Sequence, residues 1–424
     1  MSVWLVVVLF SLLALLGAPL FLVIGAFALY AFAFSGIDTS AVIINLYSIA
    51  ENPVLIAIPL FTFAGYVLAE SNSPKRLVQV AQAFFGWMPG GLAIVVLVAC
   101  AFFTAFTGAS GVTIVALGGL LYPVLLKEKY PEQFSLGLVT ASGSIGLLFP
   151  PSLPIILYEI VSKADIDKLF LAGLFPGIIL VMFLSLYSVG ISVSAKVPRV
   201  PFNFRNILSA VKGAAWEIPL PVIVIGGIYG GFFTATESAA VTAFYVLIVE
   251  VFVYKDLKLF SDVPRVMKES MLLVGAILAI VGTALGLTNY LIDAEVPQQL
   301  FELVKANVTS QITFLLILNA FLIIVGMMMD IFSAILVVVP LILPVATQFQ
   351  INPIHLGMIF LTNLEIGYLT PPVGLNLFLS SLRFSKPVLH ITRSVLMFIL
   401  LEIIALMVIT YVPELSLILV NGTD

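Results

Sequence analysis

Two short stretches, each ending in a pair of prolines, constrain the fold of this chain more than any other feature. The first, residues 144–151, reads SIGLLFPP, and the second, residues 365–372, reads EIGYLTPP. Both lie inside long apolar segments, where proline removes a backbone donor and clashes with the preceding turn of a helix. Unwound backbone at membrane depth is tolerated only where it is buried in protein or lines a cavity. Two such breaks in corresponding halves of a chain indicate the binding site of a transporter.

The composition indicates a protein that crosses a membrane many times. Of the 424 residues, 62% are hydrophobic and only 9% are charged, whereas a soluble protein of this length needs far more charge on its surface. Residues 1–4 lack the basic region of a cleaved signal peptide, so we expect them to begin the first membrane segment. The net charge of -4 and the absence of a basic run argue against a nucleic-acid partner.

Few residues are available for catalysis or for binding a transition metal. Cys100 is the single cysteine, which excludes a disulfide framework and a thiolate metal cluster. His355 and His390 are the only histidines, and they are far apart in the sequence. The chain has no HExxH motif, no His/Asp/Ser constellation and no paired intramembrane aspartates. We therefore predict that it is not an enzyme.

The apolar segments predict a helical protein with two kinds of interruption. A spanning helix needs about 20 apolar residues. We expect such runs at residues 2–16, 19–35, 53–71, 169–193, 217–233, 236–253, 269–291 and 388–413. Amphipathic stretches at 76–88 and 293–309 are predicted to lie at the membrane interface. The apolar runs 90–126 and 311–346 are interrupted near their middles, and the runs 134–162 and 353–382 carry the proline breaks.

The two halves of the chain match at a nearly constant offset. Gly65 corresponds to Gly282, 217 residues later, and Gly146 corresponds to Gly367, 221 residues later. Each half has a span, an amphipathic stretch, an interrupted run and a broken helix in the same order. A long internal repeat in a membrane protein predicts two units related by pseudo-symmetry.

The basic residues predict that the two halves are inverted. Lysine and arginine near span ends favour the cytoplasm. If 90–126 and 311–346 are re-entrant hairpins and the N-terminus is outside, 15 of the 18 basic residues are cytoplasmic and only Lys163, Lys168 and Lys305 are outside. A crossing hairpin would flip every later loop and remove this bias. We therefore predict two hairpins that open to opposite sides, and a C-terminus outside the cytoplasm.

The first hairpin tip, residues 107–113, carries groups that suit a cation or a carboxylate. The hydroxyls of Ser110 and Thr113 are neutral oxygen ligands, and the broken segment adds backbone carbonyls near Gly146 and Phe149. Backbone N–H groups at half-helix N-termini suit an anionic substrate. The alternative is a Gly/Ser face for helix packing.

The second tip contains Gly326 and Asp330. A carboxylate in a membrane segment is costly, so Asp330 is a candidate functional residue. It either shapes a cation site, caps the second hairpin helix or bonds to the tip. Glu237, after Thr234, suggests a capping arrangement at a helix start, with a subunit contact as the alternative.

Several motifs together resemble one known family. They are residues 226–239 (GGIYGGFFTATESA), residues 58–61 (IPLF) with Gly65, the Gly-Ala-Ser-Gly tip at 108–111 and both proline pairs. The chain is similar over essentially its whole length to the large membrane subunit (M, or DctM-like) of tripartite ATP-independent periplasmic (TRAP) transporters. The resemblance implies a small four-helix membrane subunit and a periplasmic substrate-binding protein as partners. It also implies sodium-driven import of an organic acid.

The resemblance further implies an all-α fold of the ion-transporter superfamily, working as an elevator in the bacterial inner membrane, with both termini periplasmic. Its layout here would be a scaffold at 1–89 and 217–310, each with an arm helix, a cytoplasmic linker at 194–216, and a transport domain at 90–193 and 311–424. The transport domain would hold the hairpins 90–126 and 311–346 and the broken helices 134–162 and 353–382.

The same resemblance implies the site residues. One sodium ion (Na+) is expected at Ser110, Val112, Gly146, Phe149 and Pro151, and a second at Gly326, Gly367, Thr370 and Pro372. Candidate substrate contacts are Thr107, Thr113, Asp330 and Asn376. The chain departs from the family in two places. It has Val112 where many members have serine, so only the carbonyl would ligate, and Ala235 where many have proline.

Two other transport functions remain as alternatives. A self-sufficient sodium/dicarboxylate symporter of the related fold would need no binding protein. A channel is disfavoured because the breaks are paired with hairpins and do not line a symmetric pore. The sequence does not identify the organic acid.

The charge pattern makes a direct prediction about membrane sidedness. A cysteine in place of Lys196 is expected to react only with reagents in the cytoplasm, and one in place of Asp424 only with reagents outside it. Impermeant maleimide labelling of intact and inside-out vesicles measures both. Labelling of both cysteines from one side would contradict the inverted arrangement.

Overall fold

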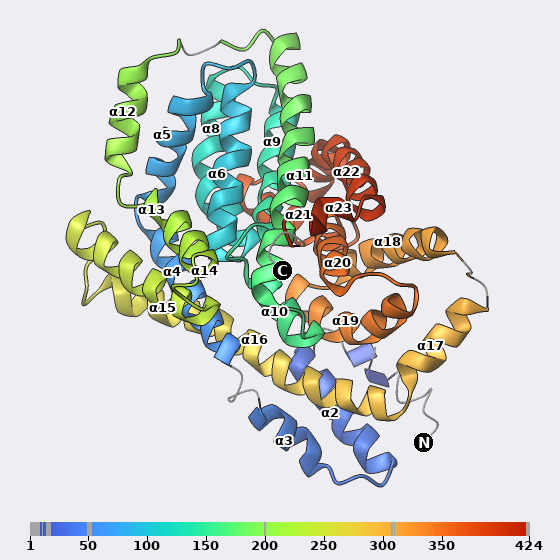
Figure 1. Cartoon of the computed structure of the whole chain (residues 1–424). Coiled ribbons are helices and arrows are strands. Elements are labelled where there is room, and N and C mark those ends of the chain that lie inside the picture. The colour runs from blue at the N-terminus through green and yellow to red at the C-terminus, as the bar shows by residue number, and fades with distance from the viewer. Residues whose placement is uncertain are drawn as a thin grey trace.

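The computed structural model describes residues 9–10, 12–13, 18–48, 53–198, 201–306, 308 and 310–420. Most of the expected apolar run 2–16 and the C-terminal residues 421–424 lie outside these ranges. Every regular element in the described residues is a helix (Figure 1). Seven helical segments in this part are long and apolar enough to cross a membrane, or up to nine if each bent pair is one span. The prediction of an all-helical polytopic membrane protein is therefore confirmed.

The first half runs from α2 to α11, and most of its elements match the expected segments. A 3-10 turn (Pro53–Ile56) precedes α4, a π-helical turn (Ile114–Gly118) joins α7 to α8, and a 3-10 turn, η4 (Ile145–Leu148), follows α9. The helices are α2 (Leu20–Phe34), α3 (Ser40–Ser48), α4 (Ala57–Glu70), α5 (Ser73–Phe85), α6 (Gly91–Thr107), α7 (Ser110–Thr113), α8 (Gly119–Lys127), α9 (Glu132–Ser142), α10 (Leu153–Ser162) and α11 (Ile166–Ser194).

The second half begins after a connecting segment that itself holds a helix, α12. π-helical turns join α13 to α14 (Val222–Gly226) and extend α15 (Val249–Val253). The helices are α12 (Phe204–Gly213), α13 (Pro219–Pro221), α14 (Gly227–Tyr229), α15 (Ala235–Ile248), α16 (Asp262–Asp293), α17 (Val296–Lys305), α18 (Gln311–Met328), α19 (Ile331–Gln348), α20 (Pro353–Tyr368), α21 (Leu375–Phe384), α22 (Val388–Tyr411) and α23 (Glu414–Leu417).

The order of elements recurs in the two halves, as the sequence offset predicts. Residues 54–70 and α5 form a bent pair with an angle of 77°, and α9 with η4 and α10 form a second bent pair with an angle of 43°. In the second half α16, α17, the pair α18–α19, the broken helix α20–α21 and α22 follow one another in the same order. Both proline pairs contain a cis peptide bond.

The structure differs from the expected segments in three places, and the first two differences have local causes. The helix α16 begins at Asp262 and not at residue 269, and Arg265 pairs with Glu269 one turn later, which supports its first turns. The polar linker contains α12, whose N-cap is Asn203. The third difference is α3, which lies where no segment was expected.

The Thr234–Glu237 arrangement at the start of α15 is a capping box. Thr234 Oγ1 accepts from the Glu237 backbone N–H, and Glu237 Oε2 accepts from the Thr234 backbone N–H at 2.9 Å. Two donors that a helix start leaves unpaired are thereby satisfied. The capping interpretation of Glu237 is confirmed.

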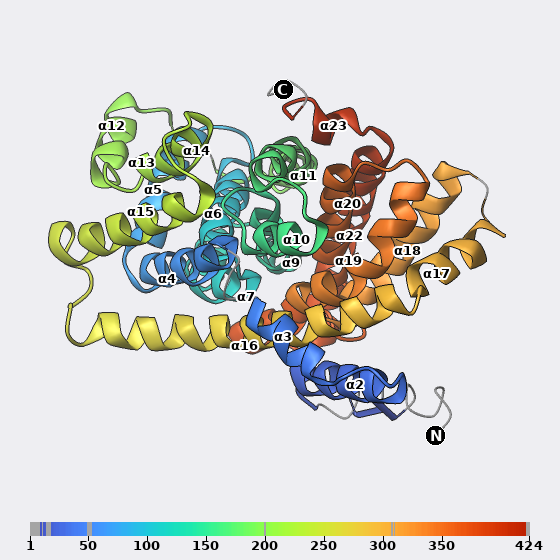
Figure 2. The ribbon, with the colours of Figure 1, turned by 60° about the horizontal axis from the view of Figure 1, so that its bottom comes forward.

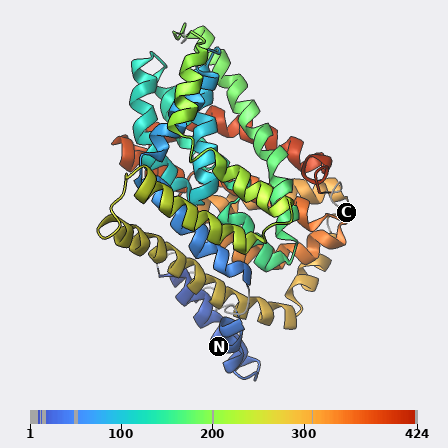
Figure 3. The ribbon, with the colours of Figure 1, turned by 60° about the vertical axis from the view of Figure 1, so that its left-hand side comes forward.

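Two layers of helices make up the molecule. In one layer α2 packs on α16, α15 packs on α4, and α4 and α16 pack on each other. Figures 2 and 3 show α15, α4 and α16 side by side, with α2 on the far side of α16. In the other layer the hairpin α6–α8 and helices α9 to α11 lie beside α18 to α22 (Figure 1). Thus α2 of the first half packs on α16 of the second, and α15 of the second half packs on α4 of the first. Two halves related by pseudo-symmetry would produce this reciprocal packing.

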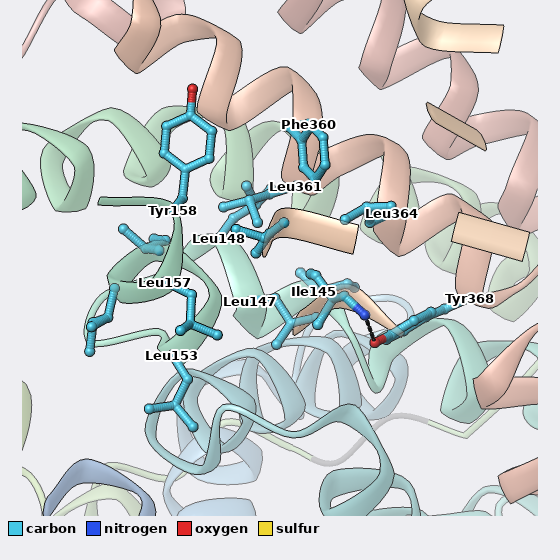
Figure 4. Packing of buried hydrophobic residues seen from close by; sticks show 14 of the residues in the cluster. Ile145, Leu147, Leu148, Leu153, Leu157, Tyr158, Phe360, Leu361, Leu364 and Tyr368 are labelled. Carbon is cyan, nitrogen blue, oxygen red and sulfur yellow. Dashed lines mark hydrogen bonds between the residues drawn. The ribbon is translucent and has the colours of Figure 1, made fainter. Parts of the chain in front are cut away.

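The two broken helices share one core. Leu148 of the first break lies beside Leu361 of α20, and Leu147 and Leu364 belong to the same buried cluster (Figure 4). The Tyr158 hydroxyl of α10 donates to the Pro353 carbonyl at 2.6 Å. Because every one of these side chains is buried, the two breaks form one packed unit, which holds them at a fixed distance from each other.

One arginine ties the bend between α4 and α5 to the second half. Arg76 donates to Glu217, Glu250 and Asp256 at 2.6, 2.8 and 2.7 Å, and its guanidinium lies 3.8 Å from the centre of the Tyr254 ring. Burial by itself would raise the pKa of Asp256, but hydrogen bonds from Asn72 and Arg76 outweigh it and hold that pKa below its usual value. A single cation therefore holds three carboxylates from separate parts of the chain.

We predict that Arg76→Met destabilises the protein by about 3–5 kcal/mol, because it leaves buried carboxylates without their counter-charge. The matched control is Arg265→Met, since Arg265 also pairs with two carboxylates, Glu70 and Glu269, but is 48% exposed. Its loss should cost about 0–1 kcal/mol. Thermal unfolding in detergent measures both, and equal losses would contradict the assigned role of Arg76.

Candidate functional site

The first tip is a sharp turn between α6 and α7. Gly108 has a left-handed backbone with φ of 62°, and a Cβ there would lie 2.4 Å from the Leu153 side chain, so only glycine fits. The chain then extends at Ala109, and α7 begins at Ser110. The Ser110 side chain is almost fully buried, yet it lies on the wall of a cavity described below. The turn thus presents a hydroxyl and exposed backbone at one place.

Hydroxyl groups behind this tip tie it to the first break. Thr104 donates to the Gly143 carbonyl at 2.9 Å, so its single hydrogen is used there. Thr113 must therefore donate in the 2.6 Å contact between its hydroxyl and that of Thr104. Gly146 packs against the same helix, because a Cβ there would lie 2.2 Å from the Ala101 carbonyl oxygen. The tip, α6 and the break form one rigid unit.

The second tip is held by its own carboxylate. Asp330 is the N-cap of α19, and its two oxygens accept from the backbone N–H of Ser333 at 3.0 Å and from the Ser333 hydroxyl. This confirms the capping interpretation of Asp330. The Tyr368 hydroxyl, on the second break, accepts from the Ile331 N–H at 2.6 Å (Figure 4). Side chains from both tip and break thus satisfy the free donors of the α19 N-terminus.

The second tip and the second break touch through glycine backbones. A Cβ at Gly367 would lie 2.5 Å from the Gly326 Cα, and one at Gly326 would lie 3.1 Å from the Gly367 Cα. The Gly374 N–H donates to the Met327 carbonyl at 3.3 Å. The backbone atoms of the tip and the break therefore approach as closely as two main chains can.

The same backbone bond occurs in both breaks. The Phe149 N–H donates to the Gly146 carbonyl, and the Thr370 N–H donates to the Gly367 carbonyl, each at 3.0 Å. Neither proline of a pair can supply the donor that a continuous helix would place there. Each break is therefore a short turn closed by a bond between residues three apart. The backbone carbonyls that follow it no longer point along a helix axis. Such carbonyls are the ligands that unwound helices offer to monovalent cations.

Both tips face one cavity of about 630 Å³. The first tip contributes Gly108 to Val112, and the second contributes Asp330 to Phe332. The opposite wall is α16, from Glu269 to Ile280, together with Tyr66 and Glu70 of α4. The site therefore lies between the two layers of helices, with both tips on one side of the cavity and α16 on the other.

Of the predicted sodium-site residues only Ser110 and Val112 line this cavity, and Phe149 lines a separate one. Phe149 turns its ring toward α11, because a Cβ at Gly177 would lie 2.6 Å from it, so only its backbone faces the break. Pro151 is buried and Pro372 is exposed. Thr370 donates its hydroxyl to the Ile366 carbonyl at 2.8 Å, which leaves its oxygen lone pairs for another partner.

Three of the four predicted substrate contacts lie behind the cavity wall. Thr107, Thr113 and Asn376 are fully buried and do not line the cavity, whereas Asp330 does. Asn376 donates to the Ser144 hydroxyl at 3.3 Å and so links the second broken helix to the first. The assignment of these three residues to substrate binding stays a prediction.

The cavity also contains residues that the sequence did not single out. Tyr368 bonds to the second tip, and its place directly after Gly367 in the second repeated stretch was the available signal. Glu70 and Glu269 line the cavity and both pair with Arg265, at 2.7 and 3.4 Å. Glu365, one turn before the second break, does not line the cavity, is 2% exposed and takes part in no ion pair among the described residues.

A family model matches this chain, and so do permeases of TRAP transporters for different solutes. The model described as "Tripartite ATP-independent periplasmic transporter, DctM component" matches residues 5–415. A C4-dicarboxylate TRAP transporter large permease protein DctM of Pseudomonas aeruginosa is 36% identical over 93% of this chain and 92% of that protein. An ectoine/5-hydroxyectoine TRAP transporter large permease protein, UehC of Ruegeria pomeroyi, is 32% identical over 96% of each chain.

The fold is also similar to a solved structure. The crystal structure of the YdaH transporter of Alcanivorax borkumensis superposes with a TM-score of 0.62, and the match covers 90% of this chain and 88% of that chain. The sequence identity is 12%, so the likeness concerns the fold alone.

The glycine contact between tip and break predicts a strong effect of one added methyl group. Gly367→Ala should lower solute uptake into proteoliposomes by about 10- to 100-fold, because overpacking at a fixed contact costs about 1–3 kcal/mol. Gly190→Ala is the matched control, since Gly190 is also helical and has nothing within 4 Å of an added Cβ. Full uptake by a folded Gly367→Ala variant would contradict the assigned contact.

Proposed function

This chain belongs to the DctM family, the large permease component of TRAP transporters, and from that premise we propose that it imports an organic acid together with sodium ions. The observation that carries the proposal is the shared cavity, because the tips of two hairpins, each hydrogen-bonded to a broken helix, face it from one side. A transporter needs substrate and coupling ion to be held by the same moving unit.

The donor set around the first break suits a sodium ion. Two buried hydroxyls in this region, Thr107 Oγ1 and Ser152 Oγ, have no hydrogen-bond partner among the described residues. Hard cations take oxygen ligands, and a monovalent cation needs no nearby carboxylate. Ser110, the backbone of Val112 and the carbonyls of Gly146, Phe149 and Pro151 would hold one ion.

The second sodium site would use mostly backbone oxygens. The close approach of Gly326 to Gly367 brings carbonyls from tip and break together. The Thr370 hydroxyl oxygen keeps its lone pairs, and Pro372 follows it directly. Two sites at matching places in the repeat would couple two ions to each cycle.

The substrate is proposed to be an organic acid, taken up as in the C4-dicarboxylate relatives. Ser110 and the N-termini of α7 and α19 meet at the cavity, where backbone N–H groups favour an anionic group. Residues of the scaffold helix α16 complete the opposite wall, so movement of the tips along α16 would carry the solute across. This is the elevator motion that two inverted halves would perform.

The remaining subunits would be a small four-helix membrane protein and a periplasmic binding protein, and both follow from the family. The chain would lie in the inner membrane with both termini in the periplasm. Family membership favours this assembly over a self-sufficient sodium/dicarboxylate symporter. Reconstitution of the complex should give uptake of the acid only with an inward sodium gradient. Equal uptake with potassium on both sides would contradict the proposal.

We predict that Ser110→Ala raises the sodium concentration for half-maximal uptake by about 10- to 100-fold. A bond to a charged group contributes about 1.5–3 kcal/mol, and about 1.4 kcal/mol corresponds to a factor of ten. The control is Ser188→Ala, because Ser188 is also buried but donates its hydroxyl to the Leu184 carbonyl within α11. An unchanged sodium dependence in the folded Ser110 variant would contradict the proposed role of Ser110 in sodium binding and would indicate that the first tip only packs helices together.

A further inference from the structure

A groove outside the transport cavity lies between α5 and α12. Its volume is about 470 Å³, and its walls come from the C-terminal half of α5, Trp87 and residues 201–210. Figure 1 shows α5 and α12 as neighbours. The amide side chains of Gln79, Gln82, Asn203 and Asn206 line it. None of the described residues that line the groove is acidic. Each amide side chain offers an NH2 donor as well as a carbonyl acceptor, and no carboxylate among these lining residues would repel an anion, so the groove can accept a phosphate group.

Two aromatic rings line the groove beside its amide side chains. Trp87 and Phe202 pack edge to face, with ring centres 5.8 Å apart and planes at 84°. Both line the groove, and both are roughly half exposed. Tryptophan at a protein surface is typical of the membrane interface, where its ring is partly in water and partly among lipids. These two rings therefore indicate a lipid environment at the groove.

The helix α12 directs its polar side toward the protein. Asn206 and Ser209 of this helix face the groove, whereas Phe204 and Leu208, one turn apart, are 69% and 62% exposed. No residue of α12 is buried. A helix that packs on a soluble protein would turn its apolar side inward. The arrangement here is the one expected of a helix whose apolar side enters a membrane surface.

Basic residues lie between these two sides of α12. Arg205 and Lys212 are seven residues apart, which is about two turns, so they share one side of the helix between the groove and the apolar face. Residues 194–216 contain four basic residues and no acidic one, in a chain with 22 acidic and 18 basic residues. A positive strip beside an apolar face attracts anionic lipids.

We propose that the groove between α5 and α12 binds the headgroup of an anionic phospholipid, with α12 lying in the membrane surface. The phosphate oxygens accept from the amide groups of the groove and pair with Arg205 and Lys212. The acyl chains run beside Phe204 and Leu208. The bound lipid fixes the position of α5, which the Arg76 cluster joins to the second half of the chain. This inference is independent of the transported solute.

The test measures lipid binding to the purified full chain in detergent. Dioleoyl phosphatidylglycerol and dioleoyl phosphatidylcholine are titrated separately, and native mass spectrometry counts the lipid retained. We expect the anionic lipid to bind at least tenfold more tightly. The double substitution Arg205→Gln with Lys212→Gln should weaken binding of the anionic lipid about 25-fold, since each basic residue near a lipid surface raises the affinity about fivefold. Gln82→Leu should weaken it with no change of charge.

The matched control removes the same charge at exposed places on other elements, with Lys163→Gln and Lys305→Gln at the ends of α10 and α17, which lie away from α5 and α12 (Figure 1). Its anionic-lipid affinity should change less than threefold, and unfolding temperatures confirm that each variant is folded. Equal binding of the two lipids, or equal loss in the control, would overturn the proposal. Free glycerol phosphate that displaces the lipid at equal concentration would also overturn it, because it would assign the groove to a soluble phosphate compound.

Discussion

The contact of a hairpin tip with a broken helix is the interaction on which the rest of this structure depends. Gly367 meets Gly326 with no room for a side chain, and Gly146 meets α6 in the same manner. Gly326 and Gly367 lie in the last turns of α18 and α20, directly before each helix ends, and Gly146 lies in the 3-10 turn η4. Polar backbone at this depth needs partners, and the opposing tip together with the shared core excludes lipid from it. The cavity between the layers exists because these contacts hold both tips on the same side.

Hydrogen bonds behind the tips explain how a site made mostly of backbone keeps its shape. Thr104 joins the first tip to Gly143, and Tyr368 joins the second tip to its own break. Asn376 joins one break to the other. The bonds of Thr104 and Asn376 lie behind the cavity wall, whereas Tyr368 and Ile331 both line the cavity, so the bond between them fixes the wall itself. A site held in this way can move as one body against α16, and that is the motion we propose for transport.

The sequence predicted much of this arrangement because glycine and proline have strong local effects. The breaks, both hairpins, the amphipathic helices and the capping roles of Asp330 and Glu237 all follow from residue types at known spacings. Contacts between distant residues were not predictable in that way. Arg76 meets Glu217 and Asp256 only after the halves have packed, and no spacing in the sequence signals this. The tyrosine bond to the second tip and the polar groove beside α12 likewise depend on packing.

Direct binding of radioactive sodium to the purified chain tests the central claim, which is that the tips and breaks together form cation sites. The account predicts saturable binding that excess unlabelled sodium displaces and that potassium does not. It further predicts that Gly326→Val, which would separate the second tip from its break, removes part of this binding and leaves the rest. Absence of saturable sodium binding to the folded chain, or equal competition by potassium, would contradict the account.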